Sequence, residues 1–174
     1  MSKMNRSPRS VLPLICCLAI LLLAAPLQAQ KWAVYFSPHG GATEAITTAV
    51  NQARTSIHVQ AYSLSSRPII KAIIAAQARG VRVHVILDQS QRRFSGLAAL
   101  LAAGVPTWLD AGHQIAHNKI MIIDGETVIT GSFNFTRSAE EYNAENLLVV
   151  HDKALAARFE TNFQAHLAHS SPVR

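Results

Sequence analysis

The chain has 174 residues, of which 49% are hydrophobic, and these values predict one domain with a sizeable core. The sequence contains no internal repeat, which excludes a repeat architecture. The formal net charge is +6, but residues 1–29 hold three basic and no acidic side chains, so residues 30–174 carry an excess of three positive charges. This mild basic excess is weak support for a polyanionic partner.

The N-terminal residues have the layout of a secretory signal peptide. Basic side chains precede a strongly apolar run at 11–25, and a small-residue cleavage signal ends at Ala29. We therefore predict a signal peptide at 1–29 and a periplasmic or secreted protein. A retained N-terminal membrane anchor is the alternative, although the run is short for a span and prolines interrupt it. Removal of the peptide would also remove both cysteines, Cys16 and Cys17, and with them any disulfide or cysteine zinc site.

Strand and helix patterns alternate along the rest of the chain. Short apolar runs between turn signals predict strands at 32–36, 57–64, 81–88, 106–109 and 144–150. Helical spacing of apolar residues predicts helices at 43–54, 69–79, 96–103 and 153–167, with a polar link or short helix at 136–142. Such alternation favours an α/β domain with helices on both faces of a sheet.

Residues 117–134 are predicted to form a β-hairpin at the centre of the chain. Two apolar, β-branched runs flank Asp124-Gly125, a strong hairpin turn signal. A two-residue loop would pair Ile123 with Glu126, and a four-residue loop would keep the same odd-to-even parity. A hairpin among the other strands makes the predicted sheet mixed rather than parallel.

Four polar side chains would share one face at the open end of this hairpin. With either loop length, the predicted pairing places His117, Lys119, Ser132 and Asn134 together. An ammonium, a hydroxyl and an amide suit a phosphate group, and an imidazole can attack phosphorus or move a proton. The hairpin therefore predicts a phosphate-directed site.

The spacing of these residues resembles the signature of the phospholipase D superfamily, the HKD motif. The pattern reads His117-x-Lys119-x4-Asp124-x6-Gly131-Ser132-x-Asn134, which is far more specific than an isolated His-x-Lys. With one copy in a short chain, residues 30–174 look most like the small single-motif bacterial endonucleases of that superfamily. The resemblance spans about 32–168 and implies an α-β-α sandwich with a mixed central sheet.

The resemblance also implies roles for the site residues. His117 would be the nucleophile that forms a phosphohistidine, and Lys119, Ser132 and Asn134 would hold the phosphate oxygens. Glu145 would orient His117 through its other ring nitrogen. Single-motif members form the site by dimerising, so a homodimer would supply a second His117 as general acid. Neither a metal nor another cofactor is expected to take part.

Three further candidates are weaker. Asp124 belongs to the motif, but its place at the turn favours a structural role through bonds to the turn backbone, with direct catalysis as the alternative. Arg92 and Arg93 could line a groove for a phosphate backbone, although a solvated loop is an equal alternative.

The remaining histidines predict no metal site. His113 and His117 are four residues apart, a spacing that suits zinc on a helix, but the strand pattern here argues against a pair. The sequence has no carboxylate cluster suited to magnesium. His58 and His84 lie within predicted strands and are interpreted as structural imidazoles with satisfied hydrogen bonds.

These features lead to one preferred function and two alternatives. The preferred function is an exported, metal-independent phosphodiesterase that acts as an endonuclease on DNA or RNA. Small size favours an open groove, because little chain remains to build an acyl pocket. A phospholipase D acting on phospholipid headgroups is the alternative with the same chemistry. A binding protein without catalysis is the third, and the intact motif argues against it.

Overall fold

The computed structural model describes residues 31–93 and 96–173. The predicted signal peptide, its cysteines and the possible anchor lie outside the described residues. Within the described part of the chain, no helix combines the length and apolarity needed to cross a membrane.

Strands and helices follow one another in nearly the predicted order. They are β1 (Trp32–Ser37), α1 (Ala42–Gln52), β2 (Ser56–Ala61), α2 (Arg67–Ala78), β3 (Arg82–Asp88), the 3₁₀ turn η1 (Gln89–Gln91), α3 (Leu97–Ala102), β4 (Thr107–Asp110), β5 (Lys119–Ile123), β6 (Thr127–Gly131), α4 (Arg137–Glu141), β7 (Glu145–His151), α5 (Lys153–His169) and β8 (Ser171–Pro172). Two details differ from prediction. The second strand ends at Ala61, with Leu64 making only a bridge to Phe135, and the short β8 was not predicted.

The strands form a mixed sheet in the order β1-β7-β6-β5-β2-β3-β4-β8. The β2–β3 and β3–β4 pairs are parallel, joined through α2 and α3, and the other neighbours are antiparallel. The predicted hairpin β5–β6 lies in the middle of this order. The prediction of a mixed central sheet is confirmed.

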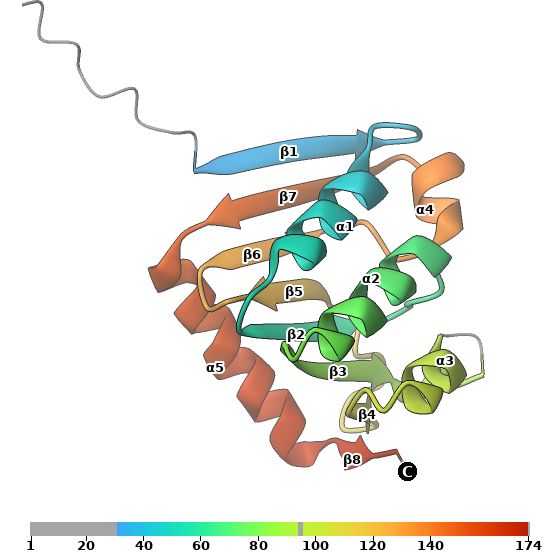
Figure 1. Cartoon of the computed structure of the whole chain (residues 1–174). Coiled ribbons are helices and arrows are strands. Elements are labelled where there is room, and N and C mark those ends of the chain that lie inside the picture. Colours follow the sequence, from blue (N-terminus) through green and yellow to red (C-terminus); the bar gives the residue numbers. More distant parts are fainter. Residues whose placement is uncertain (1–30, 94–95, 174) are drawn as a thin grey trace, which may run out of the picture.

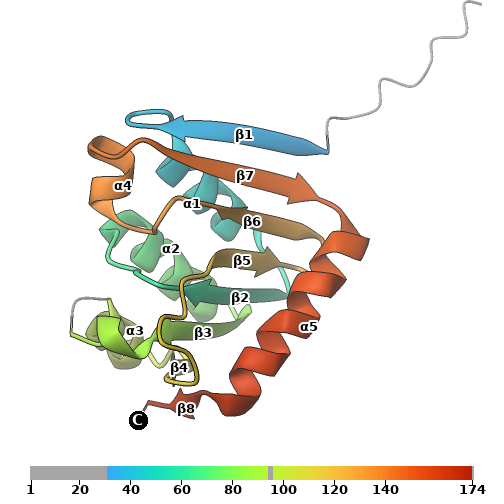
Figure 2. The same cartoon turned by 180° about the vertical axis from the view of Figure 1, so that it is seen from behind.

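Helices cover both faces of the sheet, as predicted. Figure 1 shows α1 and α2 across one face, and Figure 2 shows α5 crossing the other. On the first face, Ile46 and Val50 lie four residues apart on α1 and are fully buried. On the second face, Phe163 of α5 is 1% exposed and packs in a smaller cluster with Ile120 and Ile122 of β5. The domain is therefore an α-β-α sandwich.

The predicted turn at Asp124-Gly125 is confirmed, but the predicted pairing of residues across the hairpin is wrong. Asp124 and Gly125 have φ of 55° and 65°, and the Glu126 N–H donates to the Ile123 carbonyl over 3.0 Å. Ile123 nevertheless pairs with Thr127 rather than with Glu126. The Glu126 carbonyl instead accepts the Asp152 N–H, which removes Glu126 from the ladder. Pairing alone would therefore place the predicted site residues on opposite faces.

Candidate active site

The predicted phosphate-directed residues line one pocket, where the inner strands β5, β6 and β7 begin or end. Its cavity is about 360 Å³, and its lining residues are His117, Lys119, Gly131, Ser132, Asn134 and Glu145. Five of these six were predicted as site residues. The structure thus brings the histidine, lysine, serine, amide and carboxylate together, although the predicted register was wrong.

A bulge after β6 brings Ser132 and Asn134 back to the same side as His117 and Lys119, which the observed strand pairing alone would not do. The N–H groups of Ser132 and Phe133 both donate to the Asn146 carbonyl, over 3.1 and 3.2 Å. Two residues on one strand therefore face one residue on β7, which shifts the following side chains by one position. Phe133 remains fully buried in the core, while Ser132 and Asn134 line the pocket.

Gly131 is required at this bulge for a steric reason. Its φ is 145°, and a Cβ at this position would lie 2.3 Å from the Asn146 carbonyl oxygen. Any other residue would push β6 away from β7 at the pocket. The glycine of the motif therefore allows β6 and β7 to approach closely beside the pocket.

Lys119 supplies a buried positive charge. The side chain is 7% exposed, and its Nζ donates to the His117 carbonyl over 2.7 Å. Nζ also lies 5.3 Å from the centre of the Tyr62 ring, within reach of a cation–π interaction. Burial lowers the pKa of Lys119, and the nearby Glu145 charge opposes that effect. A phosphate that entered the pocket would therefore stabilise the charged form of Lys119.

His117 is an exposed residue of the pocket, as is Ser132. Its ring packs against Tyr62, with centroids 4.7 Å apart and planes tilted by 58°. The predicted hydrogen bond from His117 to Glu145 does not form among the described residues. Glu145 instead accepts from the Asn143 amide over 3.0 Å, because Asn143 is two residues away and within easier reach. Glu145 acts within this chain on the charge of Lys119.

Ser132 and Asn134 retain hydrogen-bonding capacity toward the pocket. Ser132 Oγ accepts from the Asn146 backbone N–H over 3.0 Å and from its side-chain amide over 3.3 Å. Both bonds use the oxygen as acceptor, so the hydroxyl hydrogen can still be donated. Asn134 Oδ1 is buried and has no partner among the described residues. Because an amide oxygen only accepts hydrogen bonds, a phosphate oxygen would have to be held by the Asn134 Nδ2 group.

Asp124 lies at the other end of β5, away from this pocket. Its carboxylate accepts from the backbone N–H groups of Arg54, Thr55 and Ser56 over 2.7–3.1 Å, and from the Thr55 hydroxyl over 2.9 Å. Burial raises the pKa of Asp124, but these bonds outweigh it and lower the pKa overall. These bonds support the structural role expected for Asp124, with one difference: the partners lie where the α1–β2 loop enters β2 rather than in the hairpin turn.

Arg92 and Arg93 do not line the pocket. Both side chains are exposed in the turn after η1. The preceding residue, Gln91, donates from its amide to the Tyr62 hydroxyl over 3.2 Å. Tyr62, which contacts both His117 and Lys119, was not identified from the sequence, since nothing in its local pattern marks it.

The other histidines are arranged differently from the sequence-based interpretation. His113 contacts Asp110, with its Nδ1 3.3 Å from the carboxylate. His58 is satisfied by Glu160 over 2.7 Å. His84 is the exception, because its Nδ1 is buried without a partner among the described residues; burial, together with the neighbouring His58, lowers its pKa.

A larger surface cavity lies between α2 and α4. It measures about 550 Å³ and is lined by Thr43, Ser65, Ser66, Arg67, Pro68, Arg137, Glu140 and Glu141. Arg137 is already paired with Glu141 over 2.7 Å, and the lining contains no histidine or lysine. Chemistry rather than size therefore identifies the smaller pocket as the candidate active site.

Comparison with known proteins matches most of the chain. The family model described as "Cardiolipin synthase, PLD-like domain" matches residues 46–167. A phospholipase D of Rickettsia conorii is 42% identical over 139 residues, which cover 79% of this chain and 70% of that protein. A mitochondrial cardiolipin hydrolase of Xenopus tropicalis is 31% identical over 115 residues, covering 65% of this chain and 55% of that protein.

Solved structures agree with the sequence relatives. The phospholipase D family member Nuc from Salmonella typhimurium superposes with a TM-score of 0.78 at 36% identity, covering 82% of this chain and 97% of that one. NucT from Helicobacter pylori has the same fold, with a TM-score of 0.75 at 24% identity, and covers 82% of this chain and 99% of that one. The family match, the fold and the composition of the pocket therefore all agree with membership of the phospholipase D superfamily.

Proposed function

We propose that this chain, which belongs to the phospholipase D superfamily of phosphodiesterases, cleaves nucleic acid through a phosphohistidine intermediate. The observation that carries the proposal is the pocket itself. It gathers an exposed histidine beside a buried lysine, a serine hydroxyl and an asparagine amide. These groups can attack a phosphodiester and hold its charged oxygens.

The first step forms a bond between phosphorus and His117. A ring nitrogen of His117 donates an electron pair to phosphorus, and the bond from phosphorus to the leaving oxygen breaks. The leaving alkoxide needs a proton, which a second acid on the opposite side of the phosphate supplies. Lys119, Ser132 and Asn134 stabilise the charge on the nonbridging oxygens.

The second step releases the phosphate from His117. A water molecule attacks phosphorus, and the group that gave its proton in the first step takes one from this water. The phosphorus–nitrogen bond breaks, and its electron pair returns to the His117 ring. The reaction thus needs a nucleophile and a separate group that transfers protons, and His117 is the only histidine that lines the described pocket.

A second copy of the chain would provide the missing acid. We infer a homodimer whose twofold axis passes through one shared site, so that the partner's histidine faces His117. Exposed apolar side chains near the pocket support this arrangement. Ile115 is 52% exposed two residues before His117, Tyr142 is 70% exposed three residues before Glu145, and Phe36 is 64% exposed on β1. In Figure 2, α5 does not extend over β1, which leaves that edge uncovered.

The proposed chemistry does not use a metal. The pocket lining contains one carboxylate, Glu145, and it lies near the Lys119 charge. A lysine and a histidine in this position are suited to an anion, whereas a divalent cation prefers several oxygen ligands. Charge stabilisation by Lys119 would take the place of metal coordination.

Access to the pocket favours nucleic acid as substrate. The cavity is small and polar in its key groups, and none of its lining residues forms an acyl-binding surface. Arg92 and Arg93 are exposed on the loop tied through Gln91 to Tyr62, where they could contact a phosphate backbone. Export by the predicted signal peptide would place this activity in the periplasm or outside the cell.

Phospholipid is the second candidate substrate. It is favoured by the names of the similar proteins, a phospholipase D and a mitochondrial cardiolipin hydrolase. The pocket chemistry would be the same for a lipid headgroup. The two candidate substrates, nucleic acid and phospholipid, therefore differ only in how they reach the pocket.

A substrate panel distinguishes them. Purified protein would be assayed in excess chelator on supercoiled plasmid, on RNA, and on phosphatidylcholine and cardiolipin vesicles, with His117→Ala as the control for contaminating activity. We expect nicking of plasmid or cleavage of RNA and no release of headgroups. Headgroup release with intact nucleic acids would support the lipid substrate, and activity restored only by a divalent ion would contradict the metal-free mechanism.

A further inference from the structure

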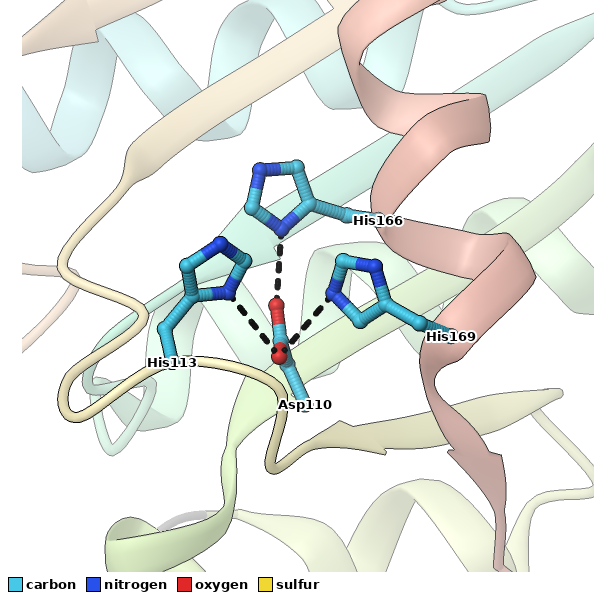
Figure 3. Close-up of side chains that lie close together, drawn as sticks. All are labelled: Asp110, His113, His166 and His169. Atoms are coloured by element: carbon cyan, nitrogen blue, oxygen red, sulfur yellow. Dashed lines mark hydrogen bonds and ion pairs between the residues drawn. The ribbon is translucent and has the colours of Figure 1, made fainter.

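Three histidines surround one buried carboxylate at the sheet edge opposite β1 (Figure 3). His166 Nδ1 lies 2.7 Å from one oxygen of Asp110, and His113 Nδ1 and His169 Nε2 lie 3.3 and 3.2 Å from the other. The Asp110 side chain is completely buried, whereas the histidines are between 13% and 47% exposed. We refer to these four residues as the His–Asp cluster.

The His–Asp cluster joins parts of the chain that are distant in sequence. Asp110 is the last residue of β4, and His113 follows it in the loop that leads to β5. His166 and His169 are three residues apart in the last turn of α5, so they project from one side of the helix. The sequence analysis missed the set because more than fifty residues separate Asp110 from either helical histidine.

The four potential ligand atoms are already close to a metal-binding arrangement. All lie within 4.8 Å of one another, with one ring nitrogen from each histidine and one carboxylate oxygen. Tetrahedral zinc with bonds of about 2.0–2.1 Å needs ligand atoms about 3.3 Å apart, so small side-chain rotations would suffice. Three imidazoles with one carboxylate form a ligand set that suits zinc and its neighbours among the transition metals.

Gly112 gives a second indication of a built site. A Cβ on this residue would lie 2.8 Å from the His169 ring and 3.4 Å from Asp110 Oδ1, so a larger residue here would require the His169 ring to shift away from the cluster. The Gly112 N–H also donates to Asp110 Oδ1 over 2.9 Å and fixes the carboxylate orientation. Backbone bonds of this kind orient carboxylate ligands in metal sites.

We propose that the His–Asp cluster binds a zinc-class divalent transition-metal ion that fastens the end of α5 to the loop between β4 and β5. The three ring nitrogens would exchange their hydrogen bonds to Asp110 for bonds to the ion, so binding releases protons where these nitrogens carry them. The partly exposed histidines leave the ion a route from solvent. Beyond the cluster, β8 pairs with β4, so the ion would secure the C-terminal edge of the sheet.

This metal site would be structural and separate from the phosphodiesterase pocket. None of its four residues lines that pocket. His113 nevertheless lies four residues before His117, in a loop held elsewhere by the bond from the Ala116 N–H to Asp88 over 2.6 Å. The ion would therefore stabilise the loop that leads to the pocket without joining the reaction.

Metal binding can be measured directly on the tag-free chain. The protein would be stripped with chelator, dialysed against Zn²⁺ or Co²⁺ at about pH 8, where free imidazole is neutral, and analysed for metal content and Co²⁺ absorption. We expect one ion per chain and the visible absorption of a tetrahedral Co²⁺ complex. The His113→Gln, His169→Gln double variant changes two exposed ligands and should weaken binding at least about tenfold.

His151→Gln serves as the matched control, because it removes an exposed histidine outside the cluster. It should bind metal as the unmodified chain does. Absence of one-to-one binding, or unchanged binding by the double variant, would overturn the assignment. Asp110→Asn, which preserves side-chain shape, provides a further test of the same ligand set.

Stability and activity then separate a structural ion from a catalytic one. At a hundredfold excess of Zn²⁺ over its Kd, the thermal midpoint should rise by about 5–10 °C in the unmodified chain. The rise should be absent in the double variant. Below the melting transition, metal-free protein should hydrolyse an aryl phosphodiester at an unchanged rate, and loss of that rate in folded protein would contradict a structural role.

Discussion

The two ends of β5 carry residues of the same motif in opposite states of bonding. At one end, Lys119 is buried beside a pocket, has a lowered pKa, and shares that pocket with an Asn134 oxygen that lacks a partner among the described residues. At the other end, the Asp124 carboxylate accepts from four donors of Arg54, Thr55 and Ser56, where the α1–β2 loop enters β2. The pocket thus retains unused hydrogen-bonding capacity, whereas the Asp124 carboxylate is bonded within the fold.

This contrast predicts that changes at the two ends separate activity from stability. Substitutions at the pocket should reduce turnover while leaving the fold intact, because the groups there make few bonds within the chain. Substitution of Asp124 should do the reverse. The tests below run from the largest expected effect to the smallest.

The largest effect should come from a mixed dimer of unmodified chain and His117→Ala. In a shared site this dimer keeps one histidine and loses the other. DNA cleavage should fall at least about a hundredfold, since the alkoxide leaving group needs the missing acid. Release of p-nitrophenol from an aryl phosphodiester should be partly retained, because that leaving group departs without a proton.

The mixed dimer would be purified with a different tag on each chain, and both substrates would be assayed on the same preparation. Homodimers of each type serve as controls. Half activity on both substrates would show two independent sites and contradict the shared-site dimer.

Lys119→Gln should lower kcat by about a hundredfold to a thousandfold through lost charge stabilisation. Stability should change little, since the buried ammonium carries a desolvation cost that its removal relieves. Steady-state kinetics on an aryl phosphodiester, together with urea denaturation, would check both statements. A change confined to KM would indicate that Lys119 binds the substrate without stabilising the transition state.

Asp124→Ala should destabilise the fold by about 1–3 kcal/mol, because the N–H groups of the α1–β2 loop lose their common acceptor. Activity per folded molecule should remain close to that of the unmodified chain. The free energy of unfolding would come from denaturant titration, with Glu126→Ala in the same turn as the control. Loss of turnover in well-folded Asp124→Ala would support the catalytic alternative for this residue.

Asp124 should also contribute to acid sensitivity. Its pKa is lower in the folded chain than the value of about 3.9 for an unfolded aspartate. The sign follows from linkage: the contribution is fully present above about pH 4 and is lost as the pH falls through the lower folded pKa. Unfolding free energies measured across this acidic range should fall less steeply in Asp124→Asn than in the unmodified chain.

The smallest effect is expected at the arginine loop. Arg92→Gln with Arg93→Gln should weaken DNA binding only a few-fold and reduce the salt dependence of binding by up to about two counterions. Hydrolysis of a small aryl phosphodiester should be unchanged. Arg158→Gln, an exposed arginine on α5, is the matched control. An unchanged salt dependence would assign Arg92 and Arg93 to a solvated loop.

The sequence alone determined the order of elements and the identity of the reactive groups. Apolar periodicity reports burial, so it located the strands and main helices to within a few residues. The spacing around His117 and Lys119 identified the superfamily because the chemistry requires those side chains together. The position of the Asp124-Gly125 turn was also determined by local sequence, since both residues can adopt a positive φ.

Only the tertiary structure decided how distant segments meet. The hairpin register depended on the Asp152 N–H, which donates a hydrogen bond to the Glu126 carbonyl. The pocket depended on the bulge at Ser132 and Phe133, whose N–H groups both donate to the Asn146 carbonyl. Tyr62 reaches His117 because β2 and β5 pair antiparallel, which brings the end of β2 beside the start of β5. Asp110 meets the histidines of α5 across the sheet edge. Such contacts arise from packing between segments far apart in the chain, and no periodicity or local spacing encodes them.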